Sequence, residues 1–138
     1  MPDRWLPEEL DTESLGAELA DRTPPGGTWL LRGELGAGKT TWTRGFVAGL
    51  GGDPDQVASP TYAVLHRYET PKGRVFHLDL FRLGSRGAWS LGLEEQVTAG
   101  DYLVVEWAGR EGPWPTAWVA ELDLLPAGEG RTARWTLP

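Results

Sequence analysis

Cysteine and asparagine are both absent from this chain of 138 residues, and histidine occurs only at His66 and His77. Without cysteine the chain has no disulfide and no Cys-based zinc site, and two histidines argue against a His-rich metal site. No apolar run approaches the ~20 residues that a membrane-spanning helix needs. The first residues also lack the apolar core of a signal peptide. We therefore expect a cytoplasmic protein with no membrane association.

Positive charge is also scarce. The chain has 13 Lys and Arg against 20 Asp and Glu, a net charge of −7, and its basic residues are scattered along the sequence. A protein that holds a nucleic acid by its phosphates usually carries a basic surface or stripe. Tight direct binding of a long nucleic acid is therefore disfavoured, and the acidic surface instead suits docking to a basic partner.

The hydrophobic pattern predicts helices interspersed with strands. One helix is expected over residues 7–21, capped by Thr12, and a second over residues 41–50, beginning near Gly38. The other expected elements are a short helix over 85–96 and strands over 28–31, 62–68, 74–81, 101–107, 118–124 and 131–137. No repeat and no long linker divides the chain. We predict a single α/β domain, residues 1–138, in which a compact sheet is flanked by helices and extended by antiparallel strands.

One motif carries specific chemistry. Residues 33–40 read Gly-Glu-Leu-Gly-Ala-Gly-Lys-Thr, the G-x-x-x-x-G-K-[ST] pattern of a P-loop, between an expected strand and an expected helix. The glycines let the backbone curl around an anion, and the helix directs its positive end at the phosphates. Lys39 would face the β- and γ-phosphates, and the Thr40 hydroxyl would ligate Mg²⁺. A glycine-rich turn with an exposed lysine is the alternative, which the flanking strand and helix disfavour.

Two carboxylates on expected strands are candidates to complete the magnesium site. Glu106 ends the apolar run Leu103-Val104-Val105, as the acidic residue of a Walker B strand does. Asp79 shares one face of its strand with His77 and Phe81, opposite Leu78 and Leu80. Polar side chains on one face of an otherwise apolar strand indicate a face that lines a site.

The nucleotide is expected to be ATP. Guanine-specific P-loop proteins usually read the base with an N-K-x-D element, and this chain has no asparagine. A D-x-x-G switch is also missing, because Leu-Phe-Arg follows Asp79. Thr61, in Ser59-Pro60-Thr61, occupies the place where many P-loop proteins keep a loop that senses the γ-phosphate, although the tripeptide alone indicates only a turn. Trp107 would stack on a base, close the pocket or lie in the core.

In this order, these elements resemble the TsaE (YjeE-type) family of P-loop ATPases in bacterial tRNA threonylcarbamoyladenosine biosynthesis. The matching segments are GELGAGKTT (33–41), TRG (43–45), ASPTY (58–62), HLDLFR (77–82), LGLEE (91–95) and VEW (105–107). The P-loop alone would not identify a family, but the added segments make the match specific. Phe81 stands where the family usually has tyrosine, and the chain departs from the family pattern after Trp107.

The resemblance implies a compact P-loop fold and a slow, Mg²⁺-dependent ATPase that works with TsaD and TsaB. Together with TsaC, these proteins modify the adenosine next to the anticodon in tRNAs that read ANN codons, so tRNA would be reached through the complex. The residues that the resemblance assigns to the nucleotide are Leu35, Gly36, Ala37, Gly38, Lys39, Thr40, Thr41 and Trp107. It assigns Mg²⁺ to Thr40 and Glu106. The catalytic residues would be Lys39, Thr61, Asp79 and Glu106.

Two other functions share the same P-loop. A small-molecule kinase usually needs a lid with phosphate-clamping arginines and a pocket for its acceptor, and little chain is left for either. Only Arg82 and Arg86 lie near such a role. A nucleotide-gated binding module with negligible turnover would use every one of the same site residues, so only an activity assay separates it from an ATPase.

Overall fold

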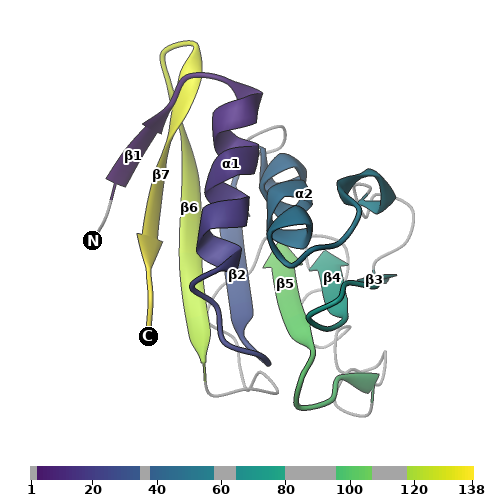
Figure 1. The fold of residues 1–138 in the computed structure, drawn as a ribbon. Coiled ribbons are helices and arrows are strands. Elements are labelled where there is room, and N and C mark those ends of the chain that lie inside the picture. Colours follow the sequence, from purple (N-terminus) through teal and green to yellow (C-terminus); the bar gives the residue numbers. More distant parts are fainter. Residues whose placement is uncertain (1–2, 35–37, 58–64, 80–95, 107–117) are drawn as a thin grey trace.

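The computed structural model describes residues 3–34, 38–57, 65–79, 96–106 and 118–138. These residues form a seven-stranded sheet with two α-helices lying against one of its faces (Figure 1). The strands are β1 (Asp3–Leu6), β2 (Thr28–Gly33), β3 (Leu65–Tyr68), β4 (Val75–Asp79), β5 (Tyr102–Glu106), β6 (Val119–Ala127) and β7 (Gly130–Thr136). The helices are α1 (Glu9–Ala20) and α2 (Lys39–Gly49), and a 3₁₀ turn covers Pro54–Gln56.

The sheet has a parallel centre and antiparallel edges. Its strand order is β1-β7-β6-β2-β5-β4-β3. The four central strands β6, β2, β5 and β4 run parallel to one another, whereas the pairs β1–β7, β7–β6 and β4–β3 are antiparallel. Every residue of β5 is buried, as the continuous apolar run predicts for a central strand, whereas β6 alternates between buried and half-buried positions. The structure confirms the predicted α/β fold with additional antiparallel strands.

The two helices pack closely because glycines face the neighbouring helix. A Cβ atom at Gly45 would lie 1.8 Å from the carbonyl oxygen of Glu13, and one at Gly16 would lie 2.1 Å from that of Trp42. A side chain at either position would therefore push the helices apart. This close layer covers the face of the sheet on which Trp29 packs against Trp42, with ring centroids 5.3 Å apart.

Both expected long helices are present, but α1 begins differently from the prediction. The Asp11 carboxylate accepts a hydrogen bond from the backbone N–H of Glu8 at 3.0 Å, so Glu8 and not Thr12 precedes the helix. Thr12 lies inside α1 and is completely buried. The prediction that Thr12 caps the helix was wrong, because the apolar stripe shows the period of a helix more clearly than its first residue.

A second apolar cluster lies on the face of the sheet opposite the helices. It consists of Leu30, Phe76, Leu78, Leu103 and Val105. Since side chains alternate along a strand, the residues between them, including His77, point to the helix side.

Several expectations fall outside this description, and one strand was not predicted. Residues 62–64, 80–81 and 107, which complete three expected strands, and the expected helix up to residue 95 are outside the described residues. Strand β1 was missed because four residues carry little pattern and the strand with which they pair, β7, lies at the other end of the chain. In the described parts of the chain, neither helix is long and apolar enough to cross a membrane.

Candidate functional site

The predicted site residues meet at the carboxyl edge of the parallel strands. Glu106 ends β5 and is the register partner of Leu31 in β2 and of Asp79 in β4. Because the three strands run in one direction, their carboxyl ends lie side by side. Helix α2 starts at Lys39, a few residues after the end of β2. The fold thus brings Lys39, Asp79 and Glu106 together.

Lys39 is buried against the end of β2. It is only 5% exposed, and its Nζ donates hydrogen bonds to the carbonyl oxygens of Gly33 at 2.7 Å and Glu34 at 3.1 Å. Burial lowers the pKa of Lys39 below its ordinary value, while the negative charges of Glu106 and Asp79 act in the opposite direction. A buried ammonium group placed in this way is suited to an anionic ligand.

Gly38, the residue before Lys39, has the backbone conformation that the motif predicts. Its φ of 102° lies in the left-handed region, where a side chain is strained. The carbonyl oxygen of Gly38 accepts the first hydrogen bond of α2, from Trp42 at 2.8 Å. The start of α2, the positive end of the helix, therefore faces the same edge of the sheet as the carboxylates.

Glu106 is fixed by a buried chain of hydrogen bonds. Its carboxylate is paired with Nε2 of His77, which is completely buried, and Nδ1 of His77 lies 2.9 Å from the Tyr68 hydroxyl. A carboxylate only accepts hydrogen bonds, so Nε2 donates to Glu106, and in a neutral ring Nδ1 then accepts from Tyr68. The His77 ring, itself held by Tyr68, therefore orients the Glu106 carboxylate.

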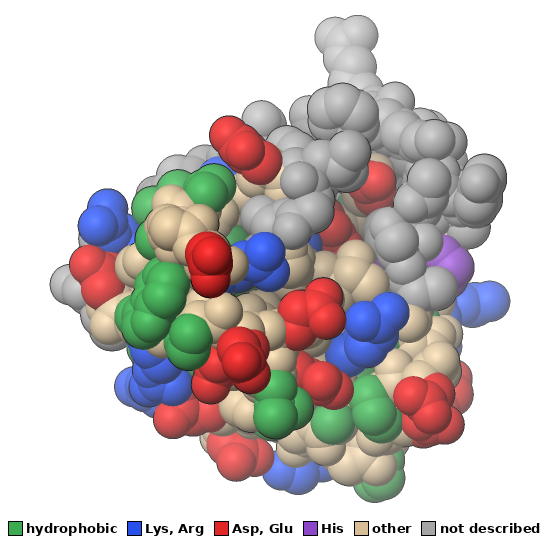
Figure 2. Space-filling model, turned by 90° about the horizontal axis from the view of Figure 1, so that it is seen from above, with side chains coloured by type: hydrophobic (Ala, Val, Ile, Leu, Met, Phe, Trp, Pro, Cys, Tyr) green, Lys and Arg blue, Asp and Glu red, His purple; other side chains and the backbone are tan. Residues whose placement is uncertain are grey.

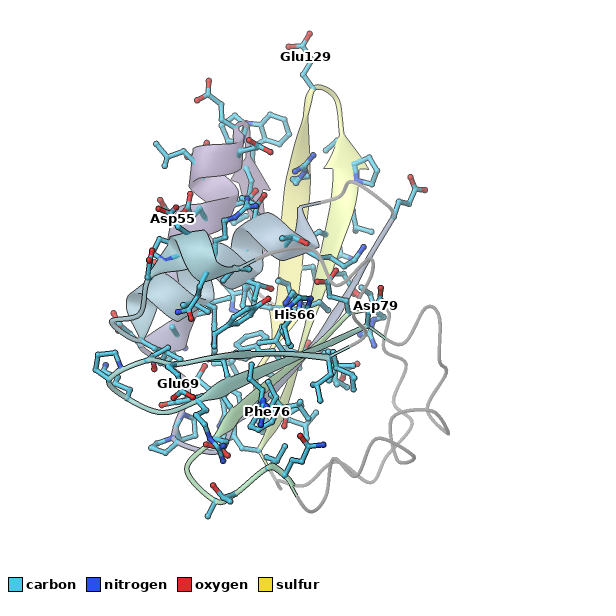
Figure 3. The ribbon with its side chains drawn as sticks, turned by 90° about the vertical axis from the view of Figure 1, so that its right-hand side faces the viewer. Asp55, His66, Glu69, Phe76, Asp79 and Glu129 are labelled. Atoms are coloured by element: carbon cyan, nitrogen blue, oxygen red, sulfur yellow. The ribbon has the colours of Figure 1, made fainter. Side chains whose placement is uncertain are left out.

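Asp79 lies at the end of β4 and is half-buried (Figure 3). It shares its face of the strand with His77, and Leu78 belongs to the cluster on the opposite face, as the alternation predicts. Phe81, the third member of the predicted face, lies outside the described residues. Asp79 is therefore next to Glu106 but more accessible, a suitable position for contact with a ligand.

The donors present fit Mg²⁺ bound together with phosphates. Thr40 is half-buried at the second position of α2, and Glu106 supplies a nearly buried carboxylate, so both are oxygen donors of the kind that Mg²⁺ takes. Within the described ranges, no three His, Asp or Glu residues cluster tightly enough to hold a metal by themselves. Mg²⁺ commonly relies on one or two protein ligands plus substrate phosphates, which matches this donor set.

The structure describes one further predicted residue of the site. Thr41 lies in the first turn of α2, where it is nearly buried. The other predicted residues, Leu35, Gly36, Ala37, Thr61 and Trp107, lie outside the described residues.

Tyr68 is the member of this site that sequence reasoning missed. It stands on β3, where the hairpin register pairs it with Val75, two residues before His77. The turn at Lys72-Gly73 is visible in the sequence, and counting back from it would have set Tyr68 near His77. The hydrogen bond between Tyr68 and His77 depends on the directions of their side chains, and the strand register alone does not predict these directions.

The charges around this end of the molecule are mixed. Figure 2 views the molecule from above Figure 1 and shows acidic and basic side chains interspersed over the visible face, with no extended basic area among the described residues.

Comparison with known proteins identifies a family. The sequence model described as "Threonylcarbamoyl adenosine biosynthesis protein TsaE" matches residues 6–132. Two proteins named tRNA threonylcarbamoyladenosine biosynthesis protein TsaE are among the relatives. The one from Aquifex aeolicus is 37% identical over 121 residues, 87% of this chain and 85% of the relative. The one from Rickettsia felis is 36% identical over 104 residues, 75% of this chain but only 60% of the relative.

A solved structure has the same fold. The crystal structure of YdiB from Bacillus subtilis superimposes with a TM-score of 0.72 at 22% identity, covering 99% of this chain and 84% of that one. At this identity the likeness concerns the fold alone, and it agrees with the α/β architecture described above.

Proposed function

This chain belongs to the TsaE family, and from that premise we propose that it is a slow, Mg²⁺-dependent ATPase that serves threonylcarbamoyl modification of tRNA. The modified base would be the adenosine next to the anticodon in tRNAs that read ANN codons. The observation that carries the ATPase proposal is the position of Lys39. It lies buried at the start of α2 and interacts electrostatically with Glu106 and Asp79 at the ends of two neighbouring parallel strands.

Each residue of the site has its own role in the proposed ATP hydrolysis. Lys39 and the N-terminus of α2 bind the β- and γ-phosphates, since both present positive charge to the same space. Thr40 and Glu106 would hold Mg²⁺, which supplies neutralising charge at the phosphate oxygens when it is bound. Asp79, the more accessible carboxylate, orients the water that attacks the γ-phosphorus, and the bond to the bridging oxygen of the leaving ADP breaks.

His77 acts through Glu106. Because it is buried and bonded on both ring nitrogens, it keeps the carboxylate aimed at one position while nucleotides come and go. The site would therefore be preorganised on the β5–β4 side, where the carboxylates stand.

The partners follow from the family. We propose that the chain acts in the cytoplasm with TsaD and TsaB, and that tRNA is reached through this complex. The net charge of −7 and the mixed surface charges support this indirect route over direct tRNA binding by this chain.

The test is phosphate release from ATP by the purified chain, alone and with TsaD and TsaB. We expect slow release that requires Mg²⁺ and changes when the partners are added, and we expect Lys39→Ala to abolish it because the variant removes the buried cation. Transfer of the phosphate to an added metabolite would instead make the chain a kinase. Binding of ATP without any release would make it a nucleotide-gated binding module.

A further inference from the structure

An arginine from the C-terminal hairpin reaches the P-loop. Arg131 is the second residue of β7, between Leu6 of β1 and Pro126 of β6 in register. Side chains alternate along the strand, and Ala133 and Trp135 are buried on the helix side, so Arg131 points to that side as well. The half-buried guanidinium of Arg131 thus lies on the same face of β7 as the apolar side chains of Ala133 and Trp135.

Arg131 lies against Gly38. A Cβ atom built on Gly38 would be 2.7 Å from Nη1 of Arg131 and 3.6 Å from its Cδ. The same atom would be 3.4 Å from the methyl group of Thr12 on α1. The last glycine of the P-loop is therefore bordered by two side chains that come from distant parts of the sequence, and its missing side chain makes room for the guanidinium.

The electrostatics of this place favour an anion. The N-terminus of α2 is the positive end of a helix, and Lys39 adds a full positive charge next to it. The guanidinium group of Arg131 brings a further positive charge to the same space, and guanidinium groups form strong charge-assisted hydrogen bonds with phosphate. Positive groups from α2 and β7 therefore converge on one position.

Thr12 borders the same place from α1. Its side chain is completely buried, and its methyl group faces Gly38, 3.4 Å from the position of a Cβ atom there. Thr12 therefore closes one side of the space beside Gly38 with an apolar group, whereas Arg131 presents a charged group to that space.

The strand order gives the direction in which a nucleotide would lie. Asp79 and Glu106 stand on the β5–β4 side of β2, whereas Arg131 stands on the β6–β7 side. A nucleotide whose γ-phosphate meets the carboxylates and Lys39 would extend across Gly38 toward Arg131. We propose that Arg131, with Thr12 beside it, binds the nucleoside 5′-phosphate end of the nucleotide. This inference rests on the proposed function and adds a binding residue to it.

The test compares two nucleotides by titration calorimetry in the presence of Mg²⁺. ATP and ADP share the nucleoside 5′-phosphate end and differ in the γ-phosphate. Arg131→Gln is therefore expected to raise the Kd of both by a similar factor, on the order of tenfold for one lost charge-assisted contact. Arg134→Gln is the matched control, because Arg134 is on the same strand but pairs with Asp3 at the surface, and it should leave both Kd values unchanged.

The outcomes separate this inference from the proposed function. Unchanged Kd values for Arg131→Gln would overturn the inference, and so would a loss confined to ATP, which would place Arg131 at the γ-phosphate. If Arg131→Gln fails to fold in a thermal melt, Arg131→Met keeps the aliphatic stem without the charge and is judged by the same two Kd values. Wild-type protein that binds neither nucleotide, or a Lys39→Ala variant that binds as wild type, would count against the proposed function itself.

Discussion

On one side of β2, along β5 and β4, charged and polar side chains are buried near the ends of the strands, whereas the ion pair that joins β7 to β1 lies at the surface. Glu106 and His77 are 5% and 0% exposed and bonded to each other. Asp3 and Arg134 form an ion pair whose side chains are 48% and 45% exposed. Within one sheet, therefore, one pair of ionisable groups is buried and hydrogen-bonded, and another is an exposed ion pair.

The difference in burial between these two pairs indicates which part of the sheet carries the function. Burying a charge is unfavourable unless partners hold it, so a buried carboxylate with a built support indicates that its position matters. Exposed ion pairs contribute little, because water and salt screen them. The parallel half of the sheet thus carries the candidate chemistry, and the antiparallel half is a scaffold from which Arg131 alone is proposed to reach the site.

The largest effect is expected from Glu106→Gln. The variant keeps the size of the side chain but removes the negative charge proposed to hold Mg²⁺, so ATP hydrolysis should fall by more than about a hundredfold, beyond the loss typical of a supporting residue. The measurement is hydrolysis rate against Mg²⁺ concentration. An unchanged Mg²⁺ titration would remove Glu106 from the metal site and weaken the contrast between the two halves.

His77→Leu should have the next largest effect. It removes the support of Glu106, and losses of such supporting groups typically cost about ten- to a hundredfold in metal affinity or activity. The readout is the Mg²⁺ concentration that gives half-maximal hydrolysis. Tyr68→Phe, which removes only the outer bond, should shift it in the same direction by less.

His66→Leu is the matched control for His77, because the two histidines are register partners on β3 and β4. His66 stacks on Tyr68, with ring centroids 6.0 Å apart, and is half-buried. Its replacement should disturb packing without freeing Glu106. An equal shift in both variants would mean that His77 acts through packing and not by orienting the carboxylate.

Asp101→Asn tests a charged group at the other end of β5. The Asp101 carboxylate accepts hydrogen bonds from Arg74 at 2.8 Å and from the N–H and hydroxyl of Thr98, both at 2.9 Å. Burial by itself raises the pKa of Asp101, but these hydrogen bonds outweigh it, and the net pKa lies below the ordinary value of 3.8. The variant should lower the free energy of unfolding near neutral pH by about 1–2 kcal/mol.

The lowered pKa of Asp101 determines how the stability difference between wild type and Asp101→Asn changes with pH. A carboxyl group with a lowered pKa in the folded state stabilises the fold above its unfolded pKa of 3.8, and that contribution is lost as the pH falls through the folded value. Urea unfolding of wild type and Asp101→Asn should therefore differ most near neutral pH and converge below about pH 4. A gap that stays constant down to pH 2 would show that the carboxylate charge is not responsible.

The smallest effect is expected from Arg134→Gln. Its partner Asp3 is exposed, and the pair joins two strands that are already connected by backbone hydrogen bonds. Urea unfolding midpoints of the variant and the wild type should coincide. A clear loss of stability would mean that the antiparallel half also depends on its charges, which would break the comparison.

Local patterns in the sequence were sufficient for much of the fold. The apolar run ending at Glu106 predicted a central strand, and the turn at Lys72-Gly73 predicted the hairpin of β3 and β4. The P-loop motif could be read from the sequence because its glycines, its lysine and its threonine all fall within residues 33–40. Strand β1 and the start of α1 were not, because a short strand and a helix end depend on partners more than on pattern.

By itself, the sequence determined a P-loop between a strand and a helix, two candidate carboxylates, and a family resemblance that the comparison confirms. Only the tertiary structure decided that Glu106 is held by His77, 29 residues earlier in the chain, and that Arg131 lies against Gly38. The physical reason is the range of the interactions. Backbone conformation and anion binding in the loop depend on neighbouring residues, whereas support of a buried carboxylate depends on strand order, register and side-chain direction, which arise only when the sheet is assembled.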